Sequence, residues 1–346
     1  MSRNNRIILS VVIGVGLLVC VLIPIIAFAS FNVLKKIEPT ASLLGSPTGT
    51  AVGDPQAGSP VCGGPASMYI LLIGSDTRAD DYYAGLSDSM RIVRVDFVHP
   101  SLMFLTFQRD LYVEIPGISS HAGITHGKLN QAYLYGNPGF GYYGGPGQGP
   151  GLLALTMQQN FGTHVDHYVA VNLKTFVRVV DAVGGIDIEL PYAVDGRTKG
   201  SKDDTLFFPS GKQHLDGNRT MLLARLRPNG DLQRSAVQDL ILQALATKIL
   251  SPSSLPQMPK AVETFYTSVQ TDLGADDLAR LLCLGALVKP ENIKAVDFPA
   301  ELFTLGRVQD PVLGYTSVWD VDFNMLRAYV QYFNKGTWPA TPLVKP

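Results

Sequence analysis

A short apolar segment that stops abruptly at polar residues constrains the fold of this chain most strongly. Residues 68–73 read Met-Tyr-Ile-Leu-Leu-Ile and are followed directly by Gly74. Continuous apolar runs of this length are typical of strands that are buried on both faces of a sheet. Open α/β sheets place their chemistry in the loops at the carboxyl ends of such strands. The polar residues that follow Gly74 are therefore the first candidates for a functional site.

Two further segments with strand character follow, over residues 90–97 and 102–107. Both are short and rich in β-branched or aromatic side chains, which predicts strands. The charged residues at or near the ends of the three segments are Asp76, Arg78, Asp88, Arg109 and Asp110. Carboxylates bind divalent cations and guanidinium groups bind phosphate oxygens, so this set indicates a metal-assisted site for an anionic, phosphorylated ligand. Taken singly, each residue also fits an ordinary role in a turn or a helix cap.

The N-terminal segment is long and apolar enough to cross a membrane. No charged residue occurs between positions 7 and 34, and residues 7–29 are apolar almost throughout. A helix of that length, rising about 1.5 Å per residue, crosses a hydrocarbon core about 30 Å thick. A cleaved signal peptide is the alternative, because Ala27-Phe28-Ala29 has a small-x-small pattern. We expect a retained single-pass anchor, a cytoplasmic tail at residues 1–6 and an extracytoplasmic body.

Residues 30–66 predict a flexible linker, because most of this stretch is rich in Pro, Gly, Ser, Ala and Thr. Beyond it, strand and helix patterns alternate, which predicts an α/β fold with a mixed central β-sheet flanked by helices on both faces. Further strands are expected over residues 167–172, 186–190 and 293–298. Helices are expected over residues 152–161, 173–183, 216–226, 234–250, 259–270, 275–288 and 322–334.

Composition excludes several other classes of protein. The net charge of −1 gives no electrostatic reason to expect nucleic-acid binding. No HExxH or GxSxG pattern occurs, so the sequence supports neither a zinc protease nor a serine hydrolase. Cys20, Cys62 and Cys283 are too far apart in sequence to form a metal motif. A disulfide between Cys62 and Cys283 is possible, but two free thiols are the expected state.

The glycine-rich segment 136–151 lacks the sequence context of a phosphate-binding loop. We interpret it as a surface insertion, with a mobile substrate-facing loop as the alternative.

A second group of charged residues occurs more than a hundred positions later. Arg225 and Arg227 precede Pro228-Asn229-Gly230, so extended geometry, with both side chains on one face, is expected for the pair. Asp231 and Arg234 lie one turn apart on the helix that follows. Together with Arg78 and Arg109, these arginines could hold a diphosphate, with Mg²⁺ bridging carboxylates and phosphate oxygens. An Arg-x-Arg pair is, however, more commonly a solvated pair.

Eight short motifs, in this order, resemble the LytR-CpsA-Psr (LCP) family. They are Gly-Ser-Asp-Thr-Arg (74–78), Ser-Asp-Ser-Met (87–90), Arg-Asp (109–110), Lys-Leu-Asn-Gln-Ala-Tyr (128–133), Asp-His-Tyr (166–168), Val-Asp-Ala-Val-Gly-Gly-Ile-Asp (180–187), Gln-His-Leu-Asp-Gly (213–217) and Ala-Arg-x-Arg followed by Gly-Asp-x-x-Arg (224–234). The resemblance covers roughly residues 67–250, which we expect to be the catalytic domain. Residues 251–346 resemble the extension of many members and are expected to pack on the same domain.

The resemblance implies an envelope phosphotransferase at the outer face of the cell membrane. Such enzymes move a glycopolymer from a polyprenyl-diphosphate carrier to a hydroxyl of a cell-wall glycan. The family fold places the prenyl chain in an apolar tunnel beside the sheet. The implied cofactor is Mg²⁺ or Mn²⁺, held by Asp76 and Asp88.

The resemblance also implies roles for the basic residues. Arg109, Arg225 and Arg227 would hold the diphosphate. The residues expected to line the same pocket are Arg78, Lys128, Arg234 and Gln238. Asp231 would orient an arginine or accept the proton of the acceptor hydroxyl, and the identity of the base is left open.

Three positions depart from the family pattern. Leu86 stands where an arginine often precedes Ser-Asp, Gln108 replaces the usual proline, and Val237 stands where a further arginine commonly occurs. Two missing positive charges could weaken diphosphate binding or change the preferred carrier. The alternative functions are a non-catalytic protein that binds polyprenyl phosphate or cell-wall glycan, and a secreted diphosphate hydrolase.

Overall fold

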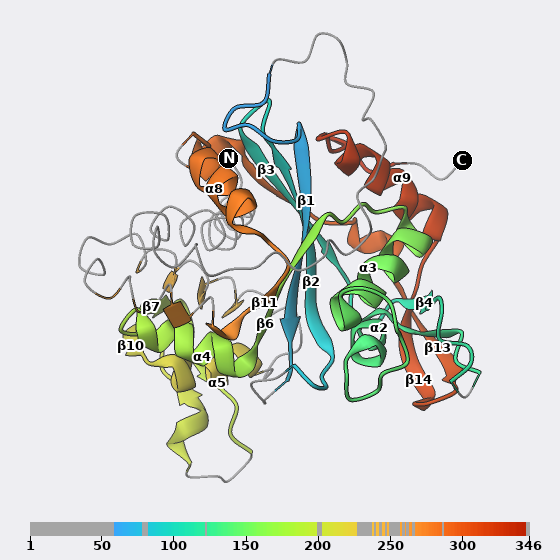
Figure 1. Cartoon of the computed structure of the whole chain (residues 1–346). Coiled ribbons are helices and arrows are strands. Elements are labelled where there is room, and N and C mark those ends of the chain that lie inside the picture. The colour runs from blue at the N-terminus through green and yellow to red at the C-terminus, as the bar shows by residue number, and fades with distance from the viewer. Residues whose placement is uncertain are drawn as a thin grey trace. The chain divides into compact units, whose positions relative to one another are not determined.

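A computed structural model describes residues 59–343 of the chain, with gaps at 78–81, 122, 199–202, 227–236, 239, 242–243, 246–247, 249–256, 258–259, 261–262, 265–266 and 286. The chain divides into two compact units (Figure 1). Unit 1 contains the described residues of 173–269 and 275–295. Unit 2 contains those of 59–172, 270–274 and 296–343.

Unit 2 is built around a mixed β-sheet (Figure 1). The strands that lie wholly in unit 2 are, in spatial order, β11 (Gln270–Thr271), β6 (His167–Asn172), β1 (Ser67–Ser75), β2 (Ser87–Asp96) and β3 (Ser101–Phe107). β1 runs parallel to β6 and antiparallel to β2, and β2 is antiparallel to β3. The mixed sheet and the α/β class are as the sequence predicts, and the apolar segment 68–73 is the interior strand β1.

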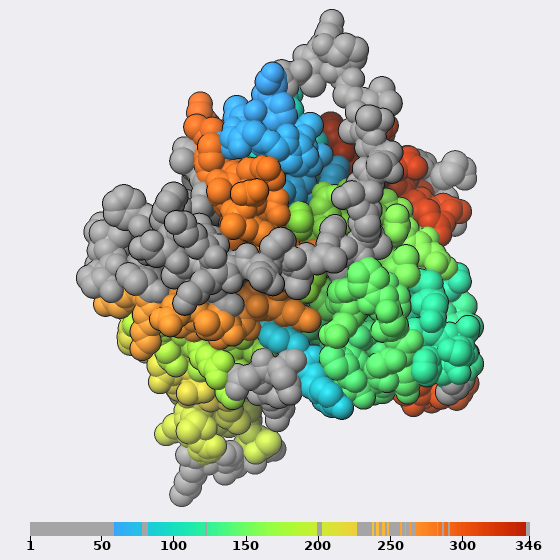
Figure 2. All heavy atoms as spheres, in the orientation of Figure 1, coloured from blue at the N-terminus to red at the C-terminus, as the bar shows by residue number. Residues whose placement is uncertain are grey.

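One face of this sheet packs against three helices. These are α2 (Leu129–Gly136), α3 (Gln148–Phe161) and α9 (Phe323–Asn334). Leu71, Ile92 and Leu105, from three neighbouring strands, are fully buried in the core that these helices cover. Burying each such side chain contributes roughly 1.5–3 kcal/mol. In Figure 2 the segments from β4 to α3, coloured teal to green, form one continuous packed surface of unit 2.

Two short antiparallel hairpins of unit 2 are absent from the sequence prediction. The first pairs β4 (Tyr112–Glu114) with β5 (His126–Lys128), and the second pairs β13 (Thr304–Asp310) with β14 (Gly314–Asp320). Leu111 bridges to Trp319, so the second hairpin lies beside β4 (Figure 1). The 3₁₀ turn η5 (Ala300–Leu302) precedes β13.

Unit 1 has a separate core. Its elements are α4 (Leu173–Ala182), β7 (Ile186–Leu190), β8 (Val194–Asp195), η2 (Asp204–Leu206), β9 (Phe207–Phe208), β10 (Gly211–Leu215), α5 (Gly217–Arg225), α8 (Ala275–Gly285) and η4 (Pro290–Asn292). β12 (Ile293–Val296) crosses the boundary between the units in sequence. Ile186, Ile188 and Leu223 are buried together, and β7 pairs with β10. Asp216 begins α5 as its N-cap, accepting a hydrogen bond from Arg219 N at 2.7 Å.

The expected strands at 167–172 and 186–190 occur with the predicted bounds, and the expected helices at 173–183, 216–226, 275–288 and 322–334 occur with slightly shorter ones. The expected helix at 234–250 lies largely outside the described residues. The expected helix at 259–270 is described in part: residues 260, 263–264 and 267–268 are helical, whereas Gln270 begins β11. The expected anchor at 7–29 and residues 30–58 of the expected linker also lie outside the described residues. Within the part of the chain that is described, none of the helices combines the length and the apolar character that crossing a bilayer requires.

The expected state of the two cysteines outside the anchor is wrong. Cys62 and Cys283 are both disulfide-bonded rather than free thiols. The glycine-rich segment 136–151 is a surface segment between two helices, as expected: it begins with the last residue of α2 and ends with the first turn of α3, and residues 138–148 are exposed or half-buried. Its aromatic residues also pack: the ring of Tyr142 stacks on His121 at 4.3 Å and on Tyr135 at 5.7 Å.

Candidate functional site

A β-bulge at Asp88 aims a carboxylate out of the sheet. Gly74 pairs with Ser89, and the next residue of β1, Ser75, pairs with Ser87. Asp88 is therefore the extra residue of β2, opposite no residue of β1. Bulges bend a strand and redirect a side chain, and they are common beside active sites. Here the redirected carboxylate meets Arg109, which follows β3.

Arg109 lies between two carboxylates. Its Nη1 donates to Asp88 Oδ1 at 2.7 Å, and its Nε donates to Asp110 Oδ2 at 3.2 Å. Burial works against the charge of the guanidinium, but the two carboxylates outweigh it and raise the pKa of Arg109. Arg109 therefore stays charged and is fixed in orientation, as binding of a phosphate group requires.

Lys128 completes a row of alternating charges. Its Nζ donates to Asp110 Oδ1 at 2.8 Å, so Asp110 holds both Arg109 and Lys128. The hairpin of β4 and β5 places Lys128 opposite Tyr112, two residues beyond Asp110. The sequence prediction included Arg109 and Lys128, and it named Asp110 among the charged residues at the strand ends without giving it an individual role.

The first residues of α2 are hydrogen-bonded to the turn that carries Arg109 and Asp110. Leu129 N donates to Leu111 O at 2.8 Å, and Asn130 N donates to Arg109 O at 3.2 Å. These amides are among the first of a helix, which have no partner within the helix itself. Asn130 is a residue that sequence reasoning missed: its side-chain oxygen is buried and has no hydrogen-bond partner in the described structure. Its place in the Lys-Leu-Asn-Gln motif was the available signal.

Asp76 lies in a tight loop where β1 gives way to β2. Its backbone N donates to Leu86 O at 3.0 Å, and Leu86 N donates to its Oδ1 at 2.6 Å. Thr77 Oγ1 donates to Ala84 O at 2.6 Å, which closes the loop further. A Cβ at Gly85 would collide with Thr77 Oγ1, so only glycine fits there.

The two aspartates expected to hold a metal fit that role. In the described structure the Oδ2 atom of Asp76 and that of Asp88 make no hydrogen bond, while each Oδ1 is fixed by one donor. Mg²⁺ is commonly bound through one or two carboxylates together with substrate phosphates and water. No group of three or more acidic, histidine or cysteine ligands occurs among the described residues. The residues present thus suit a cation that is shared with a phosphorylated ligand.

Of the basic residues expected from the later part of the chain, the structure describes Arg225, which belongs to unit 1. Arg225 is the last residue of α5 and is exposed, and Leu226 then adopts extended geometry. The expected extended geometry is thus wrong at Arg225, which is helical. Gln238 Nε2 donates to Ala224 O at 3.0 Å, which brings Gln238 to the end of α5. Other predicted site residues fall outside the described part of the chain: Arg78, Arg227, Asp231 and Arg234.

The three departures from the family pattern occupy different environments. Leu86 holds Asp76 through its backbone, so its side chain is not needed for that contact. Gln108 is exposed in the turn before Arg109. Val237 is 2% exposed in the core of unit 1, a position where a charged side chain would be costly.

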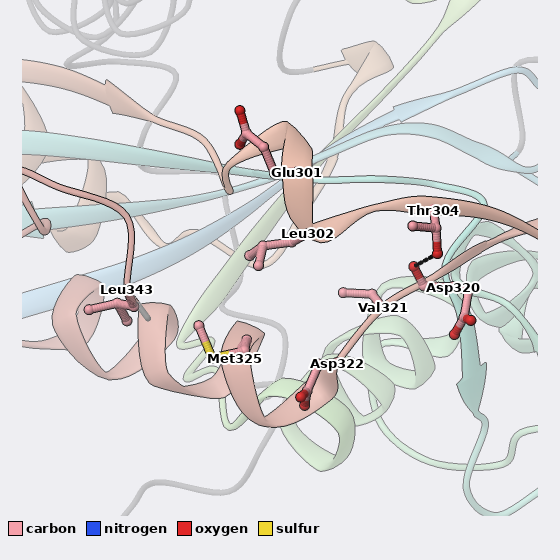
Figure 3. A pocket seen from close by; sticks show the side chains of 8 residues that line it. All are labelled: Glu301, Leu302, Thr304, Asp320, Val321, Asp322, Met325 and Leu343. Carbon is pink, nitrogen blue, oxygen red and sulfur yellow. Dashed lines mark hydrogen bonds between the residues drawn. The ribbon is translucent and has the colours of Figure 1, made fainter. Parts of the chain in front are cut away.

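A separate pocket of about 560 Å³ opens beside α9 (Figure 3). Its lining residues are Glu301, Leu302, Thr304, Asp320, Val321, Asp322, Met325 and Leu343. None of them belongs to the predicted site. Asp322 is the N-cap of α9 and accepts from Asn324 N at 3.0 Å, so this carboxylate already has a structural role.

Comparison with known proteins gives a consistent result. A protein-family model described as the LytR_cpsA_psr family matches residues 62–328. The polyisoprenyl-teichoic acid–peptidoglycan teichoic acid transferase TagU of Oceanobacillus iheyensis is 32% identical over 219 residues, which is 62% of this chain and 62% of that protein. The chain therefore spans about 62% of the length of this curated relative.

Solved structures share the fold. TagV of B. subtilis has a TM-score of 0.56 at 24% identity, over 80% of this chain and 100% of that one. A structure described as TagT bound to LI-WTA has a TM-score of 0.52 at 19% identity, over 80% of this chain and 95% of that one. At these identities the likeness concerns the fold alone.

Proposed function

Because the chain belongs to the LytR_cpsA_psr family, we propose that it transfers a glycopolymer from a polyprenyl-diphosphate carrier to a hydroxyl of a cell-wall glycan. The TagU relatives are named for transfer of teichoic acid to peptidoglycan, which supports this class of reaction. The observation that carries the proposal is the Asp88–Arg109–Asp110–Lys128 row, where two fixed cations lie beside carboxylates at the end of a sheet.

In the proposed reaction the oxygen of the acceptor hydroxyl attacks the phosphorus that carries the polymer. The bond from that phosphorus to the bridging oxygen breaks, polyprenyl phosphate leaves, and the polymer becomes joined through a phosphodiester. The acceptor proton passes to a carboxylate. Such transfers depend mainly on positioning and on neutralising negative charge.

This chain's own residues would supply the positioning. Arg109 presents a guanidinium whose orientation is set by Asp88 and Asp110 on either side. Arg225 and Arg227 would supply further charge for the diphosphate, and Lys128, Arg78, Arg234 and Gln238 would complete the pocket. Asp231 remains the candidate for orienting an arginine or accepting the proton.

Asp76 and Asp88 would hold Mg²⁺ or Mn²⁺ through the carboxylate oxygens that lack hydrogen bonds in the described structure. When bound, the cation would neutralise charge on the diphosphate. We further propose that residues 7–29 anchor the chain in the cell membrane, with the body on the extracytoplasmic side, where a lipid-linked donor and a cell-wall acceptor meet.

The test uses the full chain reconstituted in vesicles with a polyprenyl-diphosphate-linked glycopolymer, Mg²⁺ and a cell-wall glycan acceptor. The proposal predicts polymer attached to the acceptor and polyprenyl phosphate released in equal amounts. Polymer phosphate released into water without attachment would instead identify a hydrolase. Binding of the lipid without turnover of either kind would identify a binding protein.

A paired substitution checks that the expected residues carry the reaction. Replacing Arg225 and Arg227 together by alanine should abolish transfer. Unchanged turnover in this double variant would contradict the catalytic assignment.

A further inference from the structure

The hairpin of β13 and β14 exposes an unusual amount of apolar surface. Leu305 is 74% exposed, Tyr315 68%, Val312 53% and Leu313 50%. Scattered exposed apolar residues need no explanation, but these four share one hairpin of unit 2, and exposed apolar patches mark contact sites. Val312 and Leu313 form its tip, between the last residue of β13 and the first of β14.

The tip is held in a fixed shape. Asp310 is 1% exposed, and its Oδ1 accepts from Val312 N at 2.8 Å and from Leu313 N at 2.7 Å. A buried carboxylate thus orders the backbone that presents the two apolar side chains. Because the tip is already ordered, a partner that binds it avoids most of the entropy cost of ordering a loop.

The positively charged side chain of Arg307 lies on the same face of the hairpin as Leu305 and Tyr315. Residues directly opposite each other in an antiparallel pair share a face, and Leu305 faces Trp319, Arg307 faces Ser317 and Gln309 faces Tyr315. The Arg307 guanidinium lies 5.6 Å from the ring of Tyr315. Among the described carboxylates, none forms an ion pair with Arg307. An arginine and a tyrosine behind an apolar tip match the layered chemistry of a membrane interface.

The other end of the hairpin is tied to the candidate site. Trp319 N donates to Asp110 O at 3.0 Å, and Asp110 holds both Arg109 and Lys128. From Gly314 to Trp319 an extended strand reaches about 17 Å, at about 3.4 Å per residue. The apolar tip therefore lies at one end of β14, and the Arg109–Asp110 turn is hydrogen-bonded near the other end.

We propose that the β13–β14 hairpin docks on a lipid bilayer, with Val312 and Leu313 in the acyl region and Arg307 at anionic head groups. Three points favour a bilayer over a protein partner. The tip is narrow and apolar rather than broad, Arg307 complements anionic lipid, and residues 7–29 of the same chain form an apolar run of membrane-spanning length. The inference draws on the proposed function only for its lipid-linked donor, which a docked hairpin would meet at the membrane surface.

The test places a tryptophan at the tip. The full chain with Leu313→Trp is reconstituted in phosphatidylcholine vesicles containing phosphatidylglycerol, some of whose acyl chains are brominated. The matched control is Leu287→Trp in unit 1, since Leu287 is 48% exposed. The emission of Leu313→Trp should shift to the blue and be quenched by brominated lipid. The added tryptophan of Leu287→Trp should show neither the blue shift nor the additional quenching relative to the unsubstituted chain. Adding Arg307→Glu to Leu313→Trp should reduce the quenching in anionic vesicles and leave it unchanged in neutral ones.

Equal quenching of the two tryptophan variants would overturn the proposal. A blue shift of the tip tryptophan that depends on protein concentration, without quenching by brominated lipid, would also overturn it, because a second copy of the chain would then cover the tip. Val312→Trp provides a second tip variant if Leu313→Trp fails to fold. Since quenching requires no turnover, the docking proposal can fail while glycopolymer transfer is observed, and the reverse.

Discussion

Asp88 and Arg109 form an ion pair, with Nη1 of Arg109 2.7 Å from Oδ1 of Asp88, and a β-bulge makes this pair possible. Without the bulge, Asp88 would pair with a residue of β1, and its side chain would follow the regular up-and-down alternation of β2. Because it is the extra residue, its carboxylate can contact the turn that follows β3. The same arginine contacts Asp110, which also binds Lys128. The geometry of the candidate site therefore depends on one irregularity in the sheet.

Asp110→Asn should weaken the two contacts by which Asp110 orients the side chains of Arg109 and Lys128. An amide keeps the shape of the side chain but removes its charge, and hydrogen bonds to charged groups contribute about 1.5–3 kcal/mol. We expect glycopolymer transfer to fall roughly tenfold or more, since about 1.4 kcal/mol corresponds to tenfold. Transfer rates of the full chain in vesicles measure this. Asp276→Asn, an exposed position on α8, is the control and should leave the rate unchanged.

Gly85→Ala should destabilise the fold. The added Cβ would collide with Thr77 Oγ1 and crowd Asp76 Oδ1 at 3.0 Å. Crowding of this kind costs about 1–3 kcal/mol. Urea denaturation followed by circular dichroism gives the free energy of unfolding. Gly144→Ala is the matched control, because a Cβ there meets no atom within 4 Å. Equal unfolding free energies for the two variants would refute the described packing of this loop.

His164 should make stability depend on pH. Its Nε2 is 2.8 Å from Asp166 Oδ1, and this hydrogen bond raises the pKa of His164. A pKa raised in the folded state stabilises the fold fully below the unfolded-state pKa of about 6.5, and this contribution is lost as pH rises through the folded-state pKa. Thermal unfolding across that range should therefore show a decline that His164→Gln removes. His99→Gln, at an exposed position, should retain the decline.

Removal of divalent cations should stop transfer. If Asp76 and Asp88 share a cation with the diphosphate, EDTA should abolish polymer attachment and excess Mg²⁺ should restore it. Asp76→Asn should raise the Mg²⁺ concentration needed for half-maximal rate. Full activity in EDTA, with metal content verified by elemental analysis, would rule out the proposed role of these carboxylates.

The sequence predicted some strands of both units well because their signals are local. β6 and β7 occur with the expected bounds, since an apolar run or a strict alternation defines each one. The β13–β14 hairpin was not predicted, because Leu305 and Tyr315 are apolar residues on an exposed face and so disrupt the usual alternation. The pairing of Asp88 with Arg109 depends on a bulge, and no local pattern marks which residue of Ser-Asp-Ser is the extra one.

Other features were missed because long-range contacts decide them. The role of Asp110 follows from Lys128 reaching it across a hairpin, eighteen positions away. The bonded state of Cys62 and Cys283 could not be derived, because sequence spacing does not fix which distant cysteines meet. Local patterns alone do not connect residues 74–133 with residues 224–234. The order of the family motifs supplied that connection.

The most direct test of the central claim compares Arg109→Ala with Arg327→Ala in the vesicle transfer reaction. Both arginines belong to unit 2, but Arg327 is exposed on α9, where its Nη1 donates to Asn324 Oδ1 on the same helix. Loss of a charge-assisted contact of about 1.5–3 kcal/mol predicts a fall in transfer of roughly ten- to a hundredfold for Arg109→Ala. Arg327→Ala should transfer polymer at the rate of the unsubstituted chain. Equal rates for all three proteins, with folding verified by circular dichroism, would contradict the account.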